Sequence, residues 1–339
     1  MLAPRSQQKV IWLRLRSSSI GIALVVVLIS TCVLAMSQGT VSFSLSDLSS
    51  AFLRQGNPVY QTILWDLRIP RVIAGVLVGA SLGMSGAILQ GLLRNSLADS
   101  FVLGISSGAG LMAVLLLSVG GLQLWVPMGA WVGAMLASML VYSICLMGKV
   151  RTTERLILAG IAISAFLGSI QTLVLLFAEE NRVQAVLNWL IGSLNGRGWE
   201  EVRLVGPYVV IAIALGIAFS RQLNVFNLGD EMATVMGMSV VRSQILLGAI
   251  ASLLAASAVS MSGLTGFVGL VVPHGVRLLA GSNYRLILPY SALVEACVLV
   301  GADLLCRLGT IEFPVGAVTA LLGSPIFVGL IYRRSRGTA

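Results

Sequence analysis

The sequence predicts an all-α polytopic membrane protein with about ten transmembrane helices, and three observations carry that prediction. Of its 339 residues, 57% are hydrophobic and only 10% are charged, whereas a soluble domain has about 25% charged residues. The apolar runs are continuous rather than alternating, which favours helices over a membrane β-barrel. The 37 glycines fit a helical bundle, because small residues let helices pack closely in a membrane.

A membrane-spanning helix needs about 20 predominantly apolar residues. The spans expected on that basis lie at residues 19–37, 69–91, 101–119, 126–147, 156–178, 203–220, 243–262, 266–280, 286–306 and 314–332. The eighth is short and contains Pro273, which removes a backbone donor, so we expect a broken or partial helix there. No long linker divides the chain. We therefore expect one transmembrane domain over residues 19–334, flanked by cytoplasmic segments at 1–18 and 335–339.

The first span raises the question of a signal peptide. Basic residues such as Arg14 and Arg16 precede the apolar run from Ile20 to Met36. That run is at the upper end of signal-peptide length, and its exit, "AMSQGT", resembles a cleavage site only weakly. We expect a retained first span.

Positive charge sets the orientation, because cytoplasmic loops are enriched in Lys and Arg. With the N-terminus inside, most of the 22 basic residues fall on the inner side, including Arg94, Arg221, Arg242 and Arg285. Both termini are then cytoplasmic. The net charge of +9 does not indicate nucleic acid, because the basic residues flank apolar runs in short clusters.

Few side chains in the sequence indicate a metal site, a redox site or a nucleotide-binding site. The four cysteines lie in or beside apolar segments without metal or redox spacing. A lone His274 after Pro273 indicates a structural side chain rather than a metal ligand. The Gly148-Lys149 pair is followed by Val150, where a P-loop requires Ser or Thr. We therefore expect no catalytic site, no metal site and no bound cofactor in this chain.

One polar segment interrupts the apolar pattern, "VFNLGDEMATVMGMSV" at residues 225–240. An apolar stripe at helical spacing runs through it, formed by Leu228, Met232, Val235 and Met236. Asp230 and Glu231 suit the positive end of a helix dipole, and Gly237 is placed to end the helix. The segment predicts a short amphipathic helix at the inner membrane surface. It lies either on lipid headgroups or, as we favour, in a groove of a cytoplasmic protein, since its polar face is acidic and an anionic leaflet would repel it.

Six separated motifs resemble the permease subunits of binding-protein-dependent ABC importers that bring in iron–siderophores, haem and cobalamin. They are "LRIPRVIAGVLVGASLGMSGAILQGLLRNSLAD" (67–99), "LGISSGAG" (103–110), "LNWLIGSLNGRGW" (187–199), "LGDEMATVMGMSV" (228–240), "GFVGLVVPHGVRLLAG" (266–281) and "FPVGAVTALLGSPIFVGLI" (313–331). The resemblance covers residues 20 to 332 and implies a type II ABC importer permease fold.

The resemblance also implies roles for particular residues. The coupling loop, about residues 221–242, would seat in a groove of the ATPase through Gly229, Asp230, Glu231, Met232, Ala233, Met236 and Gly237. Arg68, Arg71 and Arg307 would receive glutamates of an extracytoplasmic binding protein. Asn95 and Leu97 match the cytoplasmic gate, although Ser96 and Ser100 stand where the family has prolines, which predicts a less rigid loop.

Arg68, Arg71 and Arg307 can also be interpreted without a binding protein. They could serve as interfacial anchors or as internal partners, since Asp66 is close to Arg68 and Asp303 lies one turn before Arg307.

Two features of the spans remain. Glu295 lies mid-span, where a charge costs at least about 2.5 kcal/mol. It could face a watery pathway, be protonated or be hydrogen-bonded in the bundle. Gly75, Gly79 and Gly83 recur every fourth residue, which indicates close helix packing.

The function implied is therefore a transport permease for an iron(III)–siderophore, with cobalamin or haem as alternatives. It would work, in a bacterial cytoplasmic membrane, as half of a homodimeric or heterodimeric pore with a binding protein and two ATPase subunits, which hydrolyse ATP with the help of Mg²⁺. An ion-driven secondary transporter would require paired charges at the midplane, and only Glu295 offers itself. An intramembrane enzyme would require a catalytic constellation, which the sequence does not offer.

Overall fold

A computed structural model describes residues 5–39, 41–147, 153–309 and 312–336. The Gly148-Lys149-Val150 segment and the ends of the two flanking segments, residues 1–4 and 337–339, lie outside the described residues. All regular structure in the described chain is helical.

The predicted spans correspond to apolar helices. Among the described residues, seven candidate spans are long enough to cross a membrane, and three shorter apolar helices accompany them. The ten are α1 (Arg5–Ser37), α4 (Ile69–Leu92), α5 (Ile105–Val119), α6 (Val126–Leu146), α7 (Thr153–Leu176), α9 (Trp199–Ala218), α12 (Val240–Ser262), α13 (Val268–Ala280), α14 (Tyr284–Cys306) and α15 (Val315–Arg336). The short eighth span is confirmed as the 13-residue α13, with Pro273 inside it.

Most span boundaries differ from the prediction by a few residues, and the starts of the third and first spans are two examples. The third span was expected from residue 101, but α5 begins at Ile105 because Gly104 adopts a left-handed conformation with φ 73°. A short 3₁₀ turn, η2 (Ser100–Leu103), takes the place of its first residues. The first span was expected from residue 19, but α1 continues back to Arg5.

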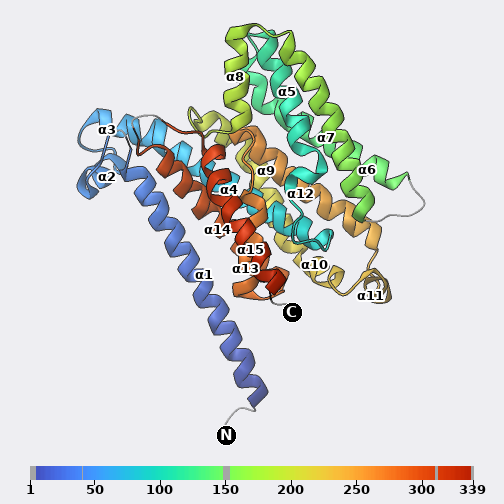
Figure 1. Ribbon diagram of the computed structural model, residues 1–339. Helices are drawn as coiled ribbons and strands as arrows, with labels where there is room; N and C mark the ends of the chain where they lie inside the picture. The colour runs from blue at the N-terminus through green and yellow to red at the C-terminus, as the bar shows by residue number, and fades with distance from the viewer. Residues whose placement is uncertain (1–4, 40, 148–152, 310–311, 337–339) are drawn as a thin grey trace.

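Helices outside the spans were not all predicted. They are α2 (Leu45–Phe52), α3 (Pro58–Thr62), the π-helical turn η1 (Ile63–Arg68), η3 (Gln123–Trp125), α8 (Glu180–Ile191), α10 (Ser220–Phe226) and α11 (Asp230–Val235). Figure 1 shows α2, α3 and α8 at one end of the bundle. The start of α1, the end of α15, and α10 and α11 lie at the other end.

Helix α4 forms the centre of the bundle, and nearly all of its residues are buried. It packs against α14, α12, α13 and α9. The predicted close packing at Gly79 is confirmed, because a Cβ there would lie 2.6 Å from the carbonyl oxygen of Glu295 and 2.7 Å from the Cα of Ala296. The backbones of α4 and α14 can approach only because Gly79 has no side chain.

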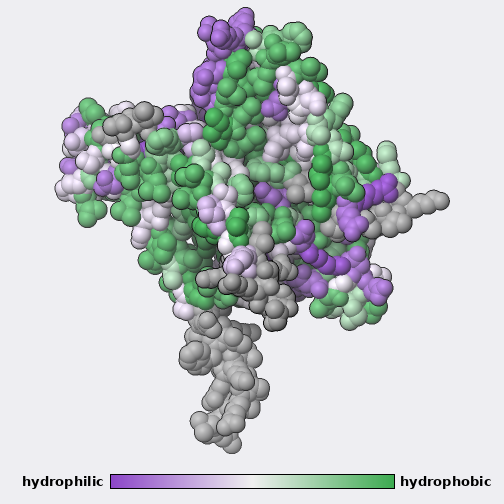
Figure 2. Space-filling model, viewed as in Figure 1, coloured by the Kyte–Doolittle hydropathy of each residue, from purple (hydrophilic) through white to green (hydrophobic). Residues whose placement is uncertain are grey.

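The molecular surface is largely apolar. Figure 2 shows hydrophobic residues over most of the visible face, with hydrophilic residues gathered over α8 and again around α10 and α11. A wide apolar belt between two polar ends is the distribution that a lipid bilayer requires. The two polar ends are therefore the regions that can meet soluble partners.

Candidate functional site

Helix α11 is the short helix that the polar segment predicts. Gly229, with φ 105°, precedes Asp230 and lets the chain turn into the helix. At the other end the N–H of Gly237 donates to the Thr234 carbonyl at 2.9 Å and that of Met238 donates to Ala233 at 3.0 Å. This pair of bonds is a Schellman motif, and Gly237 supplies the left-handed residue that it needs, with φ 79°.

The apolar stripe of α11 faces outward. Met232 is 52% exposed and Val235 is 81% exposed; Leu228 and Met236, expected on the helix, flank α11 on either side and are also exposed. Ala233, on the inner side of the helix, is fully buried, and α11 contacts α10 and α12. The helix is thus anchored by one face and presents methionine and aliphatic side chains on the other, at the end of the bundle where α1 begins and α15 ends (Figure 1). A methionine-rich exposed face adapts well to a protein groove.

Arg94 ties this helix to the central helix of the bundle. It follows the end of α4, and its guanidinium donates through Nη2 to the Asp230 carboxylate and through Nε to the Phe226 carbonyl at 2.9 Å. Arg94 has φ 47°, a left-handed conformation that is uncommon for a side chain of this size. Sequence reasoning assigned Asp230 to the coupling surface and did not find this partner, because the two residues are 136 positions apart.

The expected gate residues lie directly after Arg94. The side chain of Asn95 accepts a hydrogen bond from the Leu97 N–H at 2.9 Å, and the Ala98 N–H donates to the Asn95 carbonyl at 3.1 Å. These bonds form a compact Asx-type turn without the family's prolines. Leu97 is half exposed, at the same end of the bundle as α11.

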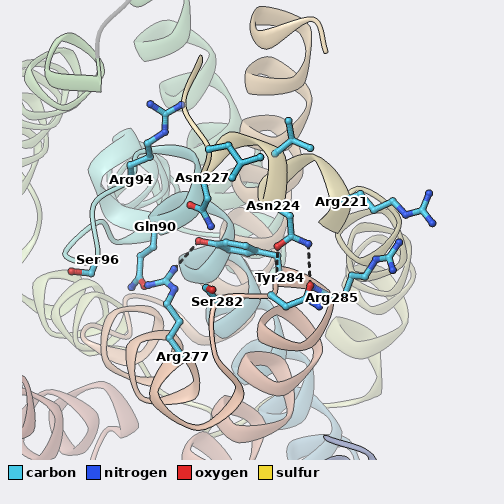
Figure 3. A pocket seen from close by; sticks show the side chains of 13 residues that line it. Gln90, Arg94, Ser96, Arg221, Asn224, Asn227, Arg277, Ser282, Tyr284 and Arg285 are labelled. Atoms are coloured by element: carbon cyan, nitrogen blue, oxygen red, sulfur yellow. Dashed lines mark hydrogen bonds between the residues drawn. The ribbon is translucent and has the colours of Figure 1, made fainter. Parts of the chain in front are cut away.

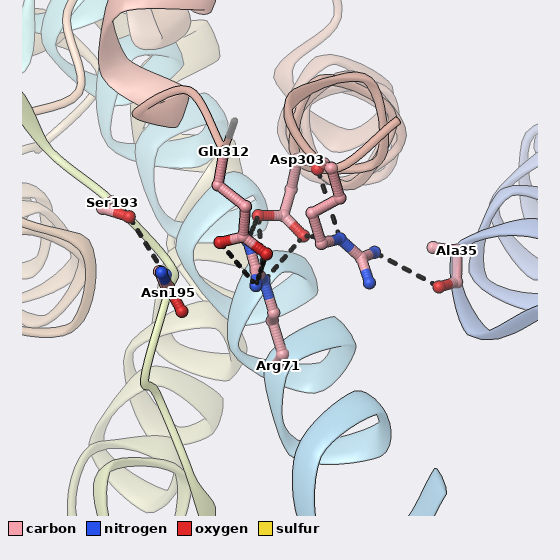
Figure 4. Close-up of polar contacts among 7 residues, drawn as sticks. Ala35, Arg71, Ser193, Asn195, Asp303 and Glu312 are labelled. Atoms are coloured by element: carbon pink, nitrogen blue, oxygen red, sulfur yellow. Dashed lines mark hydrogen bonds and ion pairs between the residues drawn. The ribbon is translucent and has the colours of Figure 1, made fainter. Parts of the chain in front are cut away.

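At the opposite end, Arg71 and Arg307 share one carboxylate (Figure 4). Arg71 donates to Asp303 at 2.9 Å and lies 3.4 Å from Glu312, while Arg307 Nε lies 3.2 Å from Asp303. Arg307 also donates to the Ala35 carbonyl at 3.2 Å. The internal Asp303–Arg307 pair that the spacing suggested is therefore present, and Arg71 joins it from α4.

Arg68 has a different set of partners from the one its sequence neighbours suggest. Its guanidinium donates to the Met36 carbonyl at 2.6 Å and to the Val41 carbonyl, and it lies 4.3 Å from the centroid of the Phe43 ring. The alternative of an Asp66 partner is not what the structure has. Arg68 links the end of α1 to the loop that follows it, because its guanidinium can donate hydrogen bonds to two carbonyl oxygens at once.

The three predicted docking arginines nevertheless come together. A cavity of about 420 Å³ at this end is lined by Arg68, Arg71, Arg307 and also Arg197, with Asp66 and Glu312 as its acidic lining residues. Burial lowers the pKa of Arg307, and the Asp303 carboxylate opposes that change. Arg68 and Arg307 are only 5% and 6% exposed, so Arg71 and Arg197 are the more accessible arginines of the group. Arg197 lies in the motif at residues 187–199, but the resemblance assigned no docking role to that motif, so the sequence did not single it out.

Within the spans, Glu295 stands apart. It is fully buried, and neither carboxyl oxygen has a hydrogen-bond partner among the described residues. The alternative of a hydrogen-bonded carboxyl in the bundle is therefore not observed.

His274 is half-buried in α13 and does interact with neighbouring groups. No group of three His, Cys, Asp or Glu side chains in the described part of the chain could hold a metal ion.

Several known transport proteins resemble this chain. Residues 24–333 match the FecCD transport family. The chain is 40% identical to the cobalamin import system permease protein of Halobacterium salinarum, over 81% of this chain and 74% of that protein. It is 37% identical to the hemin transport system permease of Yersinia pestis, over 86% of this chain and 91% of that protein.

Two further matches complete the comparison. The chain is 37% identical to the Fe(3+) dicitrate transport system permease of Escherichia coli, over 80% of this chain and 85% of that protein. An inward-facing metal-chelate type ABC transporter has a solved structure that matches with a TM-score of 0.85 and 27% identity, covering 93% of this chain and 99% of that one.

Proposed function

The chain belongs to the FecCD transport family and is a membrane permease of an ABC importer, and on that premise we propose that its cargo is an iron(III)–siderophore complex. The relatives are named for iron(III) citrate, hemin and cobalamin, which all present the metal inside an organic shell. The Fe(3+) dicitrate in the name of the Escherichia coli relative is an iron(III) chelate, the class to which a siderophore complex also belongs. Cobalamin and haem are the alternatives within the same family.

The observation that supports an ATP-driven mechanism is the exposed apolar stripe of α11. The stripe consists of Leu228, Met232, Val235 and Met236, and it lies at the end of the bundle that carries the start of α1 and the end of α15. We place this end in the cytoplasm, where a separate ATPase subunit would bind the stripe. Closure of two ATPase subunits around ATP and Mg²⁺ would then move α11 and, through Arg94, the end of α4.

The opposite end would receive an extracytoplasmic binding protein. In this proposal Arg71 and Arg197 present the accessible positive charge of the cavity, and the buried Arg68 and Arg307 hold its walls in place. An arginine guanidinium suits this role because it keeps its charge and can grip a carboxylate with two bonds. The fourth component is a second permease subunit, identical or homologous, with the transport pathway between the two.

Uptake measurements test the cargo. Cells that lack only this gene should lose uptake of a radiolabelled iron(III)–siderophore and regain it when the gene is restored, while uptake of labelled cobalamin and haem stays unchanged. Loss of cobalamin or haem uptake instead would replace the proposed cargo with that one. Continued uptake after the partner ATPase is inactivated would contradict the ATP-driven mechanism itself.

A further inference from the structure

A large basic cavity lies beside α11; Arg94 and Leu228 of the coupling surface line one side of it, and the rest of its lining has no role in the proposed coupling. Its volume is about 1040 Å³, and it opens among the ends of α4, α10, α13 and α14 (Figure 3). Four arginines line it, Arg94, Arg221, Arg277 and Arg285, and no acidic side chain of the described chain does. The other polar lining groups are asparagine, glutamine, serine and tyrosine side chains.

The floor of this cavity is rigidly built. Gln90 and Tyr284 are both only 2% exposed. The Gln90 Oε1 accepts from Arg277 at 2.6 Å, its Nε2 donates to the Leu270 carbonyl at 3.0 Å, and Arg277 also donates to the Tyr284 hydroxyl at 3.1 Å. Neutral partners thus hold the Arg277 guanidinium in place and leave its positive charge uncompensated.

The rim carries two further charges that the chain does not neutralise. Arg94 is paired with Asp230, but the guanidinium groups of Arg221 and Arg285 have no ion pair or hydrogen bond within the part of the chain that the structure describes. Figure 3 shows Arg221 and Arg285 on one side of the cavity and Arg94 on the other. Between them, Asn224 donates to the Asn283 side chain at 3.0 Å and accepts from the Tyr284 N–H at 2.8 Å.

The side with Arg221 and Arg285 lies next to an exposed apolar surface of α9, which we expect to face lipid. Arg221 lies in α10, directly after α9, whose last turns expose Ile211, Leu215 and Ile217. Arg285 lies in the first turn of α14, where the helix dipole adds to the positive potential. The two guanidinium groups therefore stand where the apolar surface ends and lipid headgroups begin. Basic pockets between transmembrane helices on the cytoplasmic side suit anionic lipid headgroups.

From this geometry we propose that the cavity is a binding site for the phosphate of an anionic phospholipid of the inner leaflet, such as phosphatidylglycerol. Arg221 and Arg285 bind the phosphodiester, Arg277 and the asparagine amides complete the site, and the acyl chains lie against the exposed face of α9. An acidic surface of the ATPase is the competing occupant. The lipid is favoured because the unpaired arginines lie next to α9, on the side of the cavity away from Arg94 and its partner in α11.

Native mass spectrometry of the full chain, released from nanodiscs of phosphatidylglycerol and phosphatidylcholine, tests this site. We expect bound phosphatidylglycerol, with Arg221→Gln and Arg285→Gln each weakening its retention about fivefold, the effect of one basic residue near a membrane surface. Arg285→Lys should retain most binding, because the charge is kept. Arg242→Gln is the matched control, since Arg242 is exposed in the first turn of α12 and does not line the cavity.

Three results would overturn the proposal. The first is unchanged lipid retention in the Arg221→Gln, Arg285→Gln double variant, or an equal loss in the Arg242→Gln control. The second is displacement of the lipid by millimolar inorganic phosphate, which would make the site one for a soluble anion. The third is intact lipid retention with lost ATPase binding, which would assign the arginines to the ATPase. None of these readouts involves iron uptake, so the lipid site and the proposed transport function can fail independently.

Discussion

Arg94 and Asp230 form an ion pair that joins the end of the central helix α4 to the first turn of α11. Both side chains are partly exposed to solvent, so the pair contributes little to global stability, in the range of about 0–1 kcal/mol. Its position matters more than its energy. The same arginine holds the Phe226 carbonyl at 2.9 Å, which fixes α10 and α11 to one point on α4.

Asp230→Ala is therefore expected to reduce ATP-driven uptake several-fold while the thermal unfolding temperature stays nearly unchanged. The reason is that the pair transmits movement of α11 to α4 rather than stabilising the bundle. Uptake assays and thermal unfolding of purified protein measure the two effects. The exchange variant Arg94→Asp with Asp230→Arg should restore part of the uptake; no recovery in that variant would argue against a role for the pair itself.

The apolar stripe of α11 gives a second prediction. Met232→Ala with Met236→Ala should weaken ATPase binding at least about tenfold, because we expect both side chains among the few central interface residues whose truncation costs more than about 1 kcal/mol each. Thr234→Ala is the control, since Thr234 is on the same helix but outside the stripe. Co-purification and titration of the ATPase subunit provide the measurement, and equal loss in the control would contradict the stripe as the contact surface.

The shared carboxylate at the other end predicts a stability effect. Asp303→Asn should destabilise the protein by roughly 3–5 kcal/mol, because it leaves the buried Arg307 and the partly buried Arg71 without their common anionic partner. Glu312→Gln should cost less than about 1 kcal/mol, since Glu312 lies 3.4 Å from Arg71 and its side chain is 34% exposed, against 4% for Asp303. Chemical or thermal unfolding in detergent micelles compares the two. Similar effects in both variants would mean that Asp303 is not the main anionic partner of the two arginines.

The packing of α4 on α14 predicts a contrast between two helical glycines. Gly79→Ala should destabilise by about 1–3 kcal/mol, because its Cβ would press on the backbone of Glu295 and Ala296. Gly168→Ala in α7 has open space within 4 Å of the new Cβ and should be neutral or stabilising by up to about 1 kcal/mol. Unfolding measurements on both variants decide this, and tolerance of Gly79→Ala would contradict the close approach.

Glu295 gives the last prediction. Glu295→Gln keeps the shape of the side chain and removes no hydrogen bond that the described residues make. The free energy of unfolding should therefore change by less than about 1 kcal/mol. A loss well above that value would show that a bound water, a second subunit or the cargo is a partner of this carboxyl. Unfolding and uptake assays of the same variant separate a structural partner from a transported one.

Sequence-based prediction succeeded where the signal is local. The helix over Asp230–Val235 and its end at Gly237 follow from residues within one short segment, and the structure confirms both. It was less successful for side-chain partners. The Asp303–Arg307 pair, one turn apart, was among the expected alternatives, whereas Arg71–Asp303 and Arg94–Asp230 were not. The roles of the coupling, docking and gate residues stay predictions.

The amino-acid sequence by itself determined that this chain lies in a membrane, roughly where its apolar helices run and which end of the bundle carries the acidic, methionine-rich helix. Lipid imposes these features directly, because every apolar run long enough to span it must satisfy its own backbone hydrogen bonds. Only the tertiary structure decided which charges meet. Arg71 and Asp303 are 232 positions apart, and their contact depends on α4 and α14 packing side by side. That contact is long-range, set by how the helix surfaces fit together, and no short stretch of sequence encodes it.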